Sequence, residues 1–190
     1  MLNKSDYHMI QEIELINNKK IIVFLNILSI LILLLAIPFF ILLANLGEST
    51  KMVSFNTNSL FDILLPLLLF LIAIIIHELI HAFFMKLFNK DGKVKFGFKN
   101  GMAYATSPNS LYSKKHFTII SLAPFVLITI TLSLLYYLGF MTPFVYVGVA
   151  SIHASGCVGD FYWVYLIKKA PANSLIEDTE TGINFYGKND

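Results

Sequence analysis

Four long apolar stretches constrain what this chain can fold into more than any other feature of the sequence. They cover about residues 21–46, 60–88, 117–140 and 144–167. Each is long enough to cross a bilayer as a helix, which takes about 20 residues. Apolar residues make up 56% of the chain and charged residues 14%, whereas soluble domains have about 25% charged residues. Because a soluble chain of this composition could not cover its surface with polar groups, we predict an all-α membrane protein with four transmembrane helices.

The distribution of lysine predicts how these helices are oriented. The chain has 14 basic residues, and all of them are lysine. Lys51 is the single lysine between the first and second spans, whereas the others precede the first span, lie between the second and third, or follow the fourth. Loops on the cytoplasmic side of a membrane carry an excess of Lys and Arg. We therefore expect both termini to be cytoplasmic.

Outside the apolar stretches, two segments carry their own signals. Residues 1–170 are expected to form a single integral membrane domain, and the polar, acidic residues 171–190 a loose cytoplasmic tail. Between the second and third spans, the strand-like runs 94–98 and 102–106 flank Asn100-Gly101, a pair that strongly favours a hairpin turn. We predict a short cytoplasmic β-hairpin there, with an ordinary loop as the alternative.

The second span contains the run His77-Glu78-Leu79-Ile80-His81. Two histidines four residues apart share one face of a helix, and both can reach a tetrahedral zinc ion at about 2.0–2.1 Å. Glu78 projects beside them, where it can take a proton from a metal-bound water. Such polar groups in a lipid-spanning helix are costly unless they are paired or liganded. The run therefore predicts a zinc site with a general base, the alternative being a polar patch that joins helices.

A hydrolytic zinc site needs a third protein ligand, and Asp160 is the candidate. Asp160 is the only carboxylate in the fourth span, and it lies eight residues before Lys168, as Glu78 lies eight residues before Lys86. At 1.5 Å per residue, both acids lie about 12 Å below the lysine-marked interface. Two acids at equal depth are expected of one shared site. The alternative is an Asp160 that pairs with a lysine or a backbone amide.

Two further residues of the fourth span have side chains that can bind metal. His153 lies seven residues before Asp160 and so on the same helix face. It is a possible alternative ligand, a hydrogen-bond partner of the ligands, an oxyanion stabiliser or a packing residue, and we rank it below Asp160 as a ligand. Cys157, the one cysteine, lies in an apolar stretch without a nearby cation, which predicts an inert buried thiol rather than a catalytic one.

The run from His77 to His81, the segment Ala123-Pro124-Phe125 and the pair Gly159-Asp160 together resemble a known family. They are similar to bacterial zincin metallopeptidases grouped as a domain of unknown function, which themselves resemble the site-2 protease class of intramembrane metalloproteases. The resemblance covers the chain from the second span to the tail, and implies a bacterial plasma-membrane enzyme.

The resemblance also assigns roles to residues. It implies that His77 and His81 are zinc ligands, that Glu78 is the catalytic base, and that Asp160 is the ligand from a later helix. It further implies that the hairpin holds substrate as an added strand. One departure is that Phe161 follows Asp160, where site-2 proteases carry an Asp-Gly pair.

These observations predict a zinc-dependent intramembrane metalloprotease that acts on a membrane-associated protein or peptide. The alternative is a non-catalytic metal-binding membrane protein, such as a regulator or a transporter subunit. We expect no nucleic-acid partner, because the chain has no Arg to form a bidentate phosphate contact and its lysines are spread through loops.

Overall fold

The computed structural model describes residues 4–15, 18–46, 60–99 and 102–189, with backbone only at 5, 60–63, 99 and 102. These residues form two compact units, and each is described by itself. The sheet unit comprises Met1–Phe24, Glu78–Pro124 and Gly159–Asp190. The helical unit comprises Leu25–His77 and Phe125–Val158.

Most of the described residues are helical, in keeping with the apolar stretches of the sequence. The helices are α1 (Lys19–Leu46), α2 (Leu60–Phe88), α3 (Lys114–Tyr137), α4 (Pro143–Gly156) and α5 (Val158–Lys169). Within the described ranges, α1, α2 and α3 are long and apolar enough to cross a membrane, and α4 with α5 would make a fourth span if the pair counts as one. The membrane helices are thus found as three or four candidate spans.

The predicted span over 144–167 is broken rather than continuous. Cys157 separates α4 from α5, with φ −73° and ψ 7°, and its N–H donates to the carbonyl of His153 over 3.1 Å. Gly156 and Gly159 flank the break, and glycine is a poor helix former because it loses the most backbone freedom on ordering. The break turns the Cys157 side chain back toward the last turn of α4.

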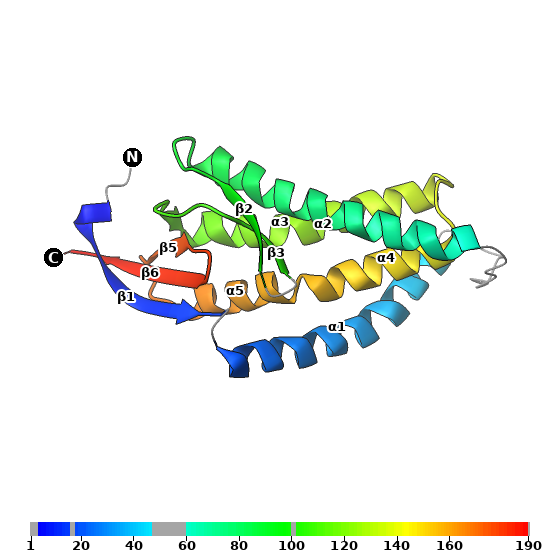
Figure 1. The fold of residues 1–190 in the computed structure, drawn as a ribbon, viewed down its shortest axis with the longest axis horizontal. Helices are drawn as coiled ribbons and strands as arrows, with labels where there is room; N and C mark the ends of the chain where they lie inside the picture. Colours follow the sequence, from blue (N-terminus) through cyan, green and yellow to red (C-terminus); the bar gives the residue numbers. More distant parts are fainter. Residues whose placement is uncertain (1–3, 16–17, 47–59, 100–101, 190) are drawn as a thin grey trace. The chain divides into compact units, whose positions relative to one another are not determined.

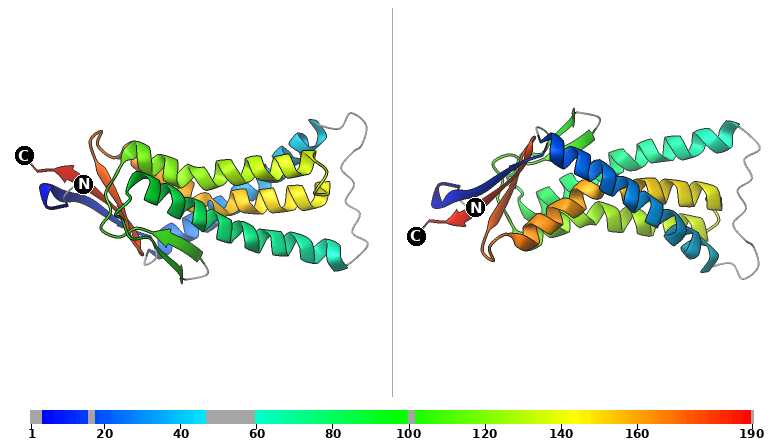
Figure 2. Two further views of the ribbon diagram at one scale, coloured as in Figure 1. Left: turned by 90° about the horizontal axis from the view of Figure 1, so that it is seen from above. Right: turned by 90° about the horizontal axis from the view of Figure 1, so that it is seen from below.

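Aromatic side chains hold the helical unit together. Tyr136 of α3 stacks on Tyr146 of α4 at 4.7 Å between ring centroids, and Phe40 of α1 meets Tyr146 edge-on at 5.8 Å. The Tyr136 hydroxyl donates to the carbonyl of Ala44 over 3.1 Å. Both views of Figure 2 show α4 running beside the part of α3 that belongs to this unit. The rings therefore fix α4, which carries His153 and is capped by Cys157.

The sheet unit contains two antiparallel sheets. The larger has the strand order β1-β6-β5-β4, formed by β1 (Tyr7–Glu14), β4 (Tyr112–Ser113), β5 (Leu175–Asp178) and β6 (Gly182–Lys188). The smaller pairs β2 (Lys95–Lys99) with β3 (Met102–Thr106), and the predicted turn at Asn100-Gly101 lies outside the described residues. A short 3-10 helix, η1 (Lys4–Asp6), precedes β1, which lies beside β6 in Figure 1.

The sheet corrects two expectations. The protein is not all-α, and residues 171–190 are not a loose tail, because they form β5 and β6 between β1 and β4. The physical reason is that Ile176, Ile183 and Phe185 are almost completely buried in the core of the sheet unit. Burying each such side chain contributes about 1.5–3 kcal/mol, and the strand pairing of β5 with β6 and β4 satisfies the backbone of the same segment.

The core of the sheet unit joins the sheet to three helices. Its buried members come from α2, α3, α5 and strands β4, β5 and β6: Met85, Tyr112, Phe117, Ile120, Ile167, Ile176, Ile183 and Phe185. Met85 lies one turn after His81 on α2, and Ile167 two turns after Asp160 on α5. This packing therefore fixes the segments of α2 and α5 that carry the candidate ligands.

A buried carboxylate joins the N-terminal segment to this sheet. Both oxygens of Glu177 lie 2.9 Å from Lys4 Nζ, and they also accept hydrogen bonds from the Tyr186 hydroxyl (2.6 Å) and the Asn109 N–H (2.8 Å). Burial favours the neutral acid, but the bonds from Lys4, Tyr186 and Asn109 outweigh it and hold the pKa of Glu177 below its ordinary value. Glu177 is therefore an ionised structural link.

Candidate metal centre

His81 and Asp160 meet inside the sheet unit. His81 Nε2 lies 3.2 Å from Asp160 Oδ1, with side-chain exposures of 10% and 14%. Zinc bonds of about 2.0–2.2 Å at tetrahedral angles would place a nitrogen and an oxygen ligand about 3.3–3.5 Å apart. Imidazole nitrogen and carboxylate oxygen are both ordinary zinc donors. The pair therefore fits two corners of one zinc ion.

A backbone carbonyl orients the His81 ring. His81 Nδ1 lies 2.9 Å from the carbonyl oxygen of Ile120 on α3, and because a carbonyl only accepts, Nδ1 carries the proton. Nε2, which lies 3.2 Å from Asp160 Oδ1, is then the ring nitrogen that can serve as a metal ligand. Histidines that bind metal usually donate their other ring N–H in this way, which fixes both the tautomer and the ring orientation.

The Ile120 carbonyl is available because of the residue one turn further along α3. In an α-helix this oxygen would accept the N–H of residue 124, but residue 124 is Pro124, which has no N–H. Pro124 thus removes the competitor for the carbonyl to which His81 Nδ1 donates. The proline of the segment Ala123-Pro124-Phe125 therefore has a structural role in positioning His81.

Two more carboxylates belong to the same part of the sheet unit. Glu78 is half-buried on α2, three residues before His81, and Asp178 is buried at the end of β5. Burial raises the pKa of the Asp178 carboxyl to about 7; Asp160 and Glu78 add to the rise, while Thr106 and the charge of His81 oppose it. The carboxyl of Asp178 is therefore close enough to interact electrostatically with His81, Asp160 and Glu78. Asp178 was not among the predicted site residues, because residues 171–190 were expected to form a loose tail. The signal for a strand was the apolar pair Leu175-Ile176 just before it.

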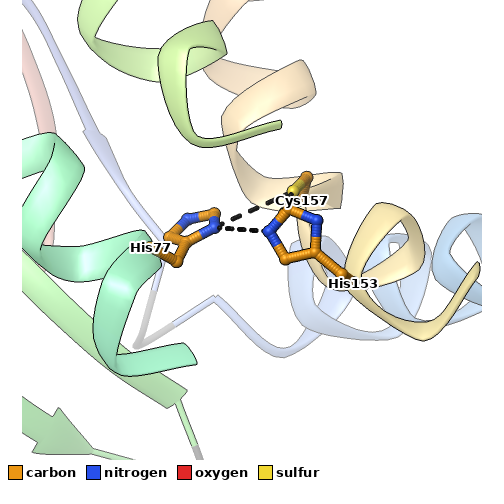
Figure 3. A group of neighbouring side chains, drawn as sticks. All are labelled: His77, His153 and Cys157. Carbon is orange, nitrogen blue, oxygen red and sulfur yellow. Dashed lines mark hydrogen bonds between the residues drawn. The ribbon is translucent and has the colours of Figure 1, made fainter. Parts of the chain in front are cut away.

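Three other donors converge in the helical unit. His77 Nδ1 lies 3.2 Å from His153 Nε2, and Cys157 Sγ lies 3.9 Å from His77 Nδ1 and 3.8 Å from His153 Nε2. Figure 3 shows the His77 ring of α2 facing both side chains. His77 is half-buried, whereas His153 is 4% exposed and Cys157 is fully buried. The three ligand atoms lie close enough together to hold one metal ion.

The local fold explains this convergence. His153 and Cys157 are four residues apart, so they share a face at the end of α4. Since Cys157 caps α4 through its N–H bond to His153, its thiol stays beside the histidine ring. The sequence suggested His153 as a lower-ranked ligand and Cys157 as an inert thiol. The structure brings both to His77, while α2 carries His77 and His81 one turn apart.

One comparison with known proteins finds a match. A family model described as "putative zincin peptidase" matches residues 70–175, which is more than half of the chain. The matched segment contains every candidate ligand described above, together with Glu78 and Pro124. No curated protein and no solved structure matches the chain.

Proposed function

The chain belongs to this zincin peptidase family, and from that membership we propose a zinc-dependent intramembrane metalloprotease. We propose His77, His81 and Asp160 as the zinc ligands. Glu78 is the proposed general base. The substrate class that fits a site on membrane helices is a membrane-associated protein or peptide.

The observation that carries the proposal is the His81–Asp160 pair with its fixed tautomer. The 3.2 Å separation and the Nδ1 hydrogen bond to Ile120 are what a zinc-binding histidine and carboxylate require. His77 precedes His81 by one helical turn, so α2 offers a second imidazole on the same face. Three protein ligands leave a fourth position open, which is the arrangement of hydrolytic zinc sites.

When bound, zinc polarises a carbonyl and makes a coordinated water more acidic. The protein's own groups then move the proton. Glu78 accepts the proton of the attacking water and passes it to the leaving amine.

A transmembrane substrate must unwind before it can react, because a helix keeps its carbonyls in its own hydrogen bonds. The proposal therefore favours extended segments at a membrane surface. We also propose that both termini face the cytoplasm of a bacterial plasma membrane, as the lysine distribution indicates. A membrane-impermeant thiol reagent should then fail to label a cysteine introduced at either terminus in intact cells, and labelling would contradict the orientation.

The test of the proposed function is Glu78→Gln. The amide keeps the size of Glu78 but cannot accept a proton, so hydrolysis should fall by about 10²–10⁴-fold, the usual contribution of a general base. Zinc content, measured by mass spectrometry on the purified full chain, should not change. Hydrolysis of a mixed-sequence fluorogenic peptide library provides the assay.

The matched control is Glu180→Gln, because Glu180 is an exposed acid paired with Lys95 at 3.1 Å in the same unit. Its hydrolysis should equal that of the wild type. If Glu78→Gln also hydrolyses peptides at the wild-type rate, the general-base mechanism is wrong. The buried thiol and imidazoles beside His77 would then favour the alternative, a non-catalytic metal-binding membrane protein.

A further inference from the structure

We propose that His77, His153 and Cys157 form a second metal site, which takes a thiophilic cation such as Zn²⁺ or Cu⁺. The site lies entirely within the helical unit and uses two residues, His153 and Cys157, that the proposed catalytic centre does not need. Two imidazole nitrogens and one thiol sulfur suit soft and borderline cations, whereas Mg²⁺ and Ca²⁺ prefer oxygen ligands.

The distances between the donor atoms match those around a single metal ion. Bonds of about 2.0–2.1 Å to nitrogen and about 2.3 Å to sulfur place two tetrahedral nitrogen ligands about 3.3 Å apart, and nitrogen and sulfur about 3.6 Å apart. The observed separations are 3.2 Å between the His77 and His153 nitrogens, and 3.8 and 3.9 Å from these nitrogens to Cys157 Sγ. Each bond is therefore reached by a shift of a few tenths of an ångström.

The surroundings favour a cation bound by a thiolate. Cys157 and His153 are buried, and a buried thiol resists ionisation unless a positive charge lies beside it. A bound cation supplies that charge and deprotonates a coordinating thiol. The resulting thiolate offsets part of the cation's own charge, which an apolar environment requires.

The donors are also held in place before any metal binds. Cys157 is fixed by its N–H bond to the His153 carbonyl, and the His77 and His153 rings meet edge-to-face at 5.4 Å. The Ser29 hydroxyl of α1 donates to the Ser155 carbonyl over 3.0 Å, which anchors the same turn of α4. Preorganised ligands lose little conformational freedom on binding, so they bind more tightly.

His77 belongs to both donor sets, so the second site would compete with the proposed zinc centre for this ring. That consequence rests on the proposed function, whereas the existence of the site does not. Metal binding at the second site can therefore be measured in protein that lacks His81 and Asp160.

The experiment uses the purified full chain in detergent, stripped of metal with a chelator and titrated with Co²⁺ as the probe. The double substitution H81A/D160A removes two donors of the sheet unit and leaves all three donors of the helical unit. This variant should bind about one equivalent of Co²⁺. It should also show the intense near-ultraviolet absorption of a cobalt–thiolate bond, which carboxylate and imidazole ligands do not produce.

Adding Cys157→Ser to that variant should abolish the cobalt–thiolate band and weaken Co²⁺ binding by more than about tenfold. Adding Ser151→Ala instead is the matched control, since Ser151 is a buried residue of the same helix, and the band should remain. Circular dichroism checks that each variant is helical. Absence of the band in H81A/D160A, or its persistence after Cys157→Ser, overturns the proposal.

The outcomes separate this proposal from the proposed function. A thiolate band in a protein that hydrolyses no peptide supports the second site and counts against the protease. Peptide hydrolysis by a zinc-loaded protein whose H81A/D160A variant shows no band supports the protease and removes the second site.

Discussion

The two donor groups differ in the chemistry of their atoms and in their surroundings. In the sheet unit, His81 faces the carboxylate of Asp160, and Glu78 and Asp178 lie within electrostatic reach. In the helical unit, His77 faces a second histidine and the thiol of Cys157. One group combines an imidazole with charged oxygen donors, and the other combines neutral, softer donors, of which His153 and Cys157 are buried.

The reason for this division lies in what surrounds each unit. The outer faces of the helical unit are apolar and exposed, as Leu35 (72%) and Leu42 (60%) of α1 illustrate, so a charge there would face lipid. The helical unit has two acidic residues, Glu48 and Asp62, and neither belongs to the described side chains. The sheet unit has polar strands and loops that can solvate carboxylates. Hydrolytic chemistry, which needs water and a base, is therefore expected in the sheet unit.

The largest effect is expected from Asp160→Ala, which tests whether the catalytic zinc binds at the carboxylate of the sheet unit. In a Cys157→Ser background, which removes the thiolate of the second proposed site, loss of the third ligand of a catalytic zinc should weaken zinc binding by more than about 100-fold, because loss of a partner that only orients a ligand already costs 10–100-fold. Competition with a chromophoric chelator measures the affinity. Asp91→Ala, at an exposed acid after α2, is the control. Unchanged zinc affinity in Asp160→Ala would move the zinc to the set that contains His153.

A smaller effect is expected from Pro124→Ala. Alanine supplies the missing N–H on α3, which competes with His81 Nδ1 for the Ile120 carbonyl. Zinc affinity should fall by about 10–100-fold, as for other partners that orient a metal-binding histidine. The helix should become no less stable, since proline is the poorer helix former by about 3 kcal/mol.

Pro38→Ala is the matched control, because Pro38 lies inside α1 in the helical unit. The same backbone N–H is restored there, and zinc affinity should remain that of the wild type. If Pro124→Ala and Pro38→Ala bind zinc equally well, the freed carbonyl does not position His81. The hydrogen bond to Ile120 would then have no measurable role in zinc binding by His81.

The sequence alone predicted the helices and part of the site, for local reasons. Long apolar runs specify membrane helices, and the four-residue spacing of His77 and His81 specifies one helix face. The equal spacing of Glu78 and Asp160 from their lysines anticipated that Asp160 and α2 meet, and Asp160 does contact His81. Whether these residues bind zinc and catalyse hydrolysis stays a prediction.

The remaining features depend on contacts between distant segments. β1 and β6 pair from opposite ends of the chain, with Tyr7 opposite Lys188, and a short polar strand carries little signal without its partner. The approach of Cys157 to His77 depends on a break inside an apolar run, where hydropathy predicts one continuous helix. The approach of Asp178 to Glu78, His81 and Asp160 depends on the pairing of β5 with β6, which hydropathy does not predict.

The smallest expected effect is a change in the stability of the sheet unit that leaves the helical unit unchanged and does not involve metal binding. Glu177→Gln removes the charge that Lys4, Tyr186 and the Asn109 N–H bind, which should cost the sheet unit about 1.5–3 kcal/mol, the range for hydrogen bonds to charged groups. Hydrogen exchange should become faster in β1 and β6. Exchange in α4, whose contacts lie in the helical unit, should not change.

Acid should act on the wild type in the same direction. Because the folded-state pKa of Glu177 lies below the ordinary 4.5, ionised Glu177 stabilises the folded state above pH 4.5, and this contribution is lost as the pH falls through the folded pKa. The protection factors of β1 and β6, corrected for the intrinsic pH dependence of exchange, should therefore fall below pH 4.5 in the wild type and depend less on pH in Glu177→Gln. An equal loss of protection in α4 would mean that the two units unfold together. Their difference would then be one of donor chemistry alone.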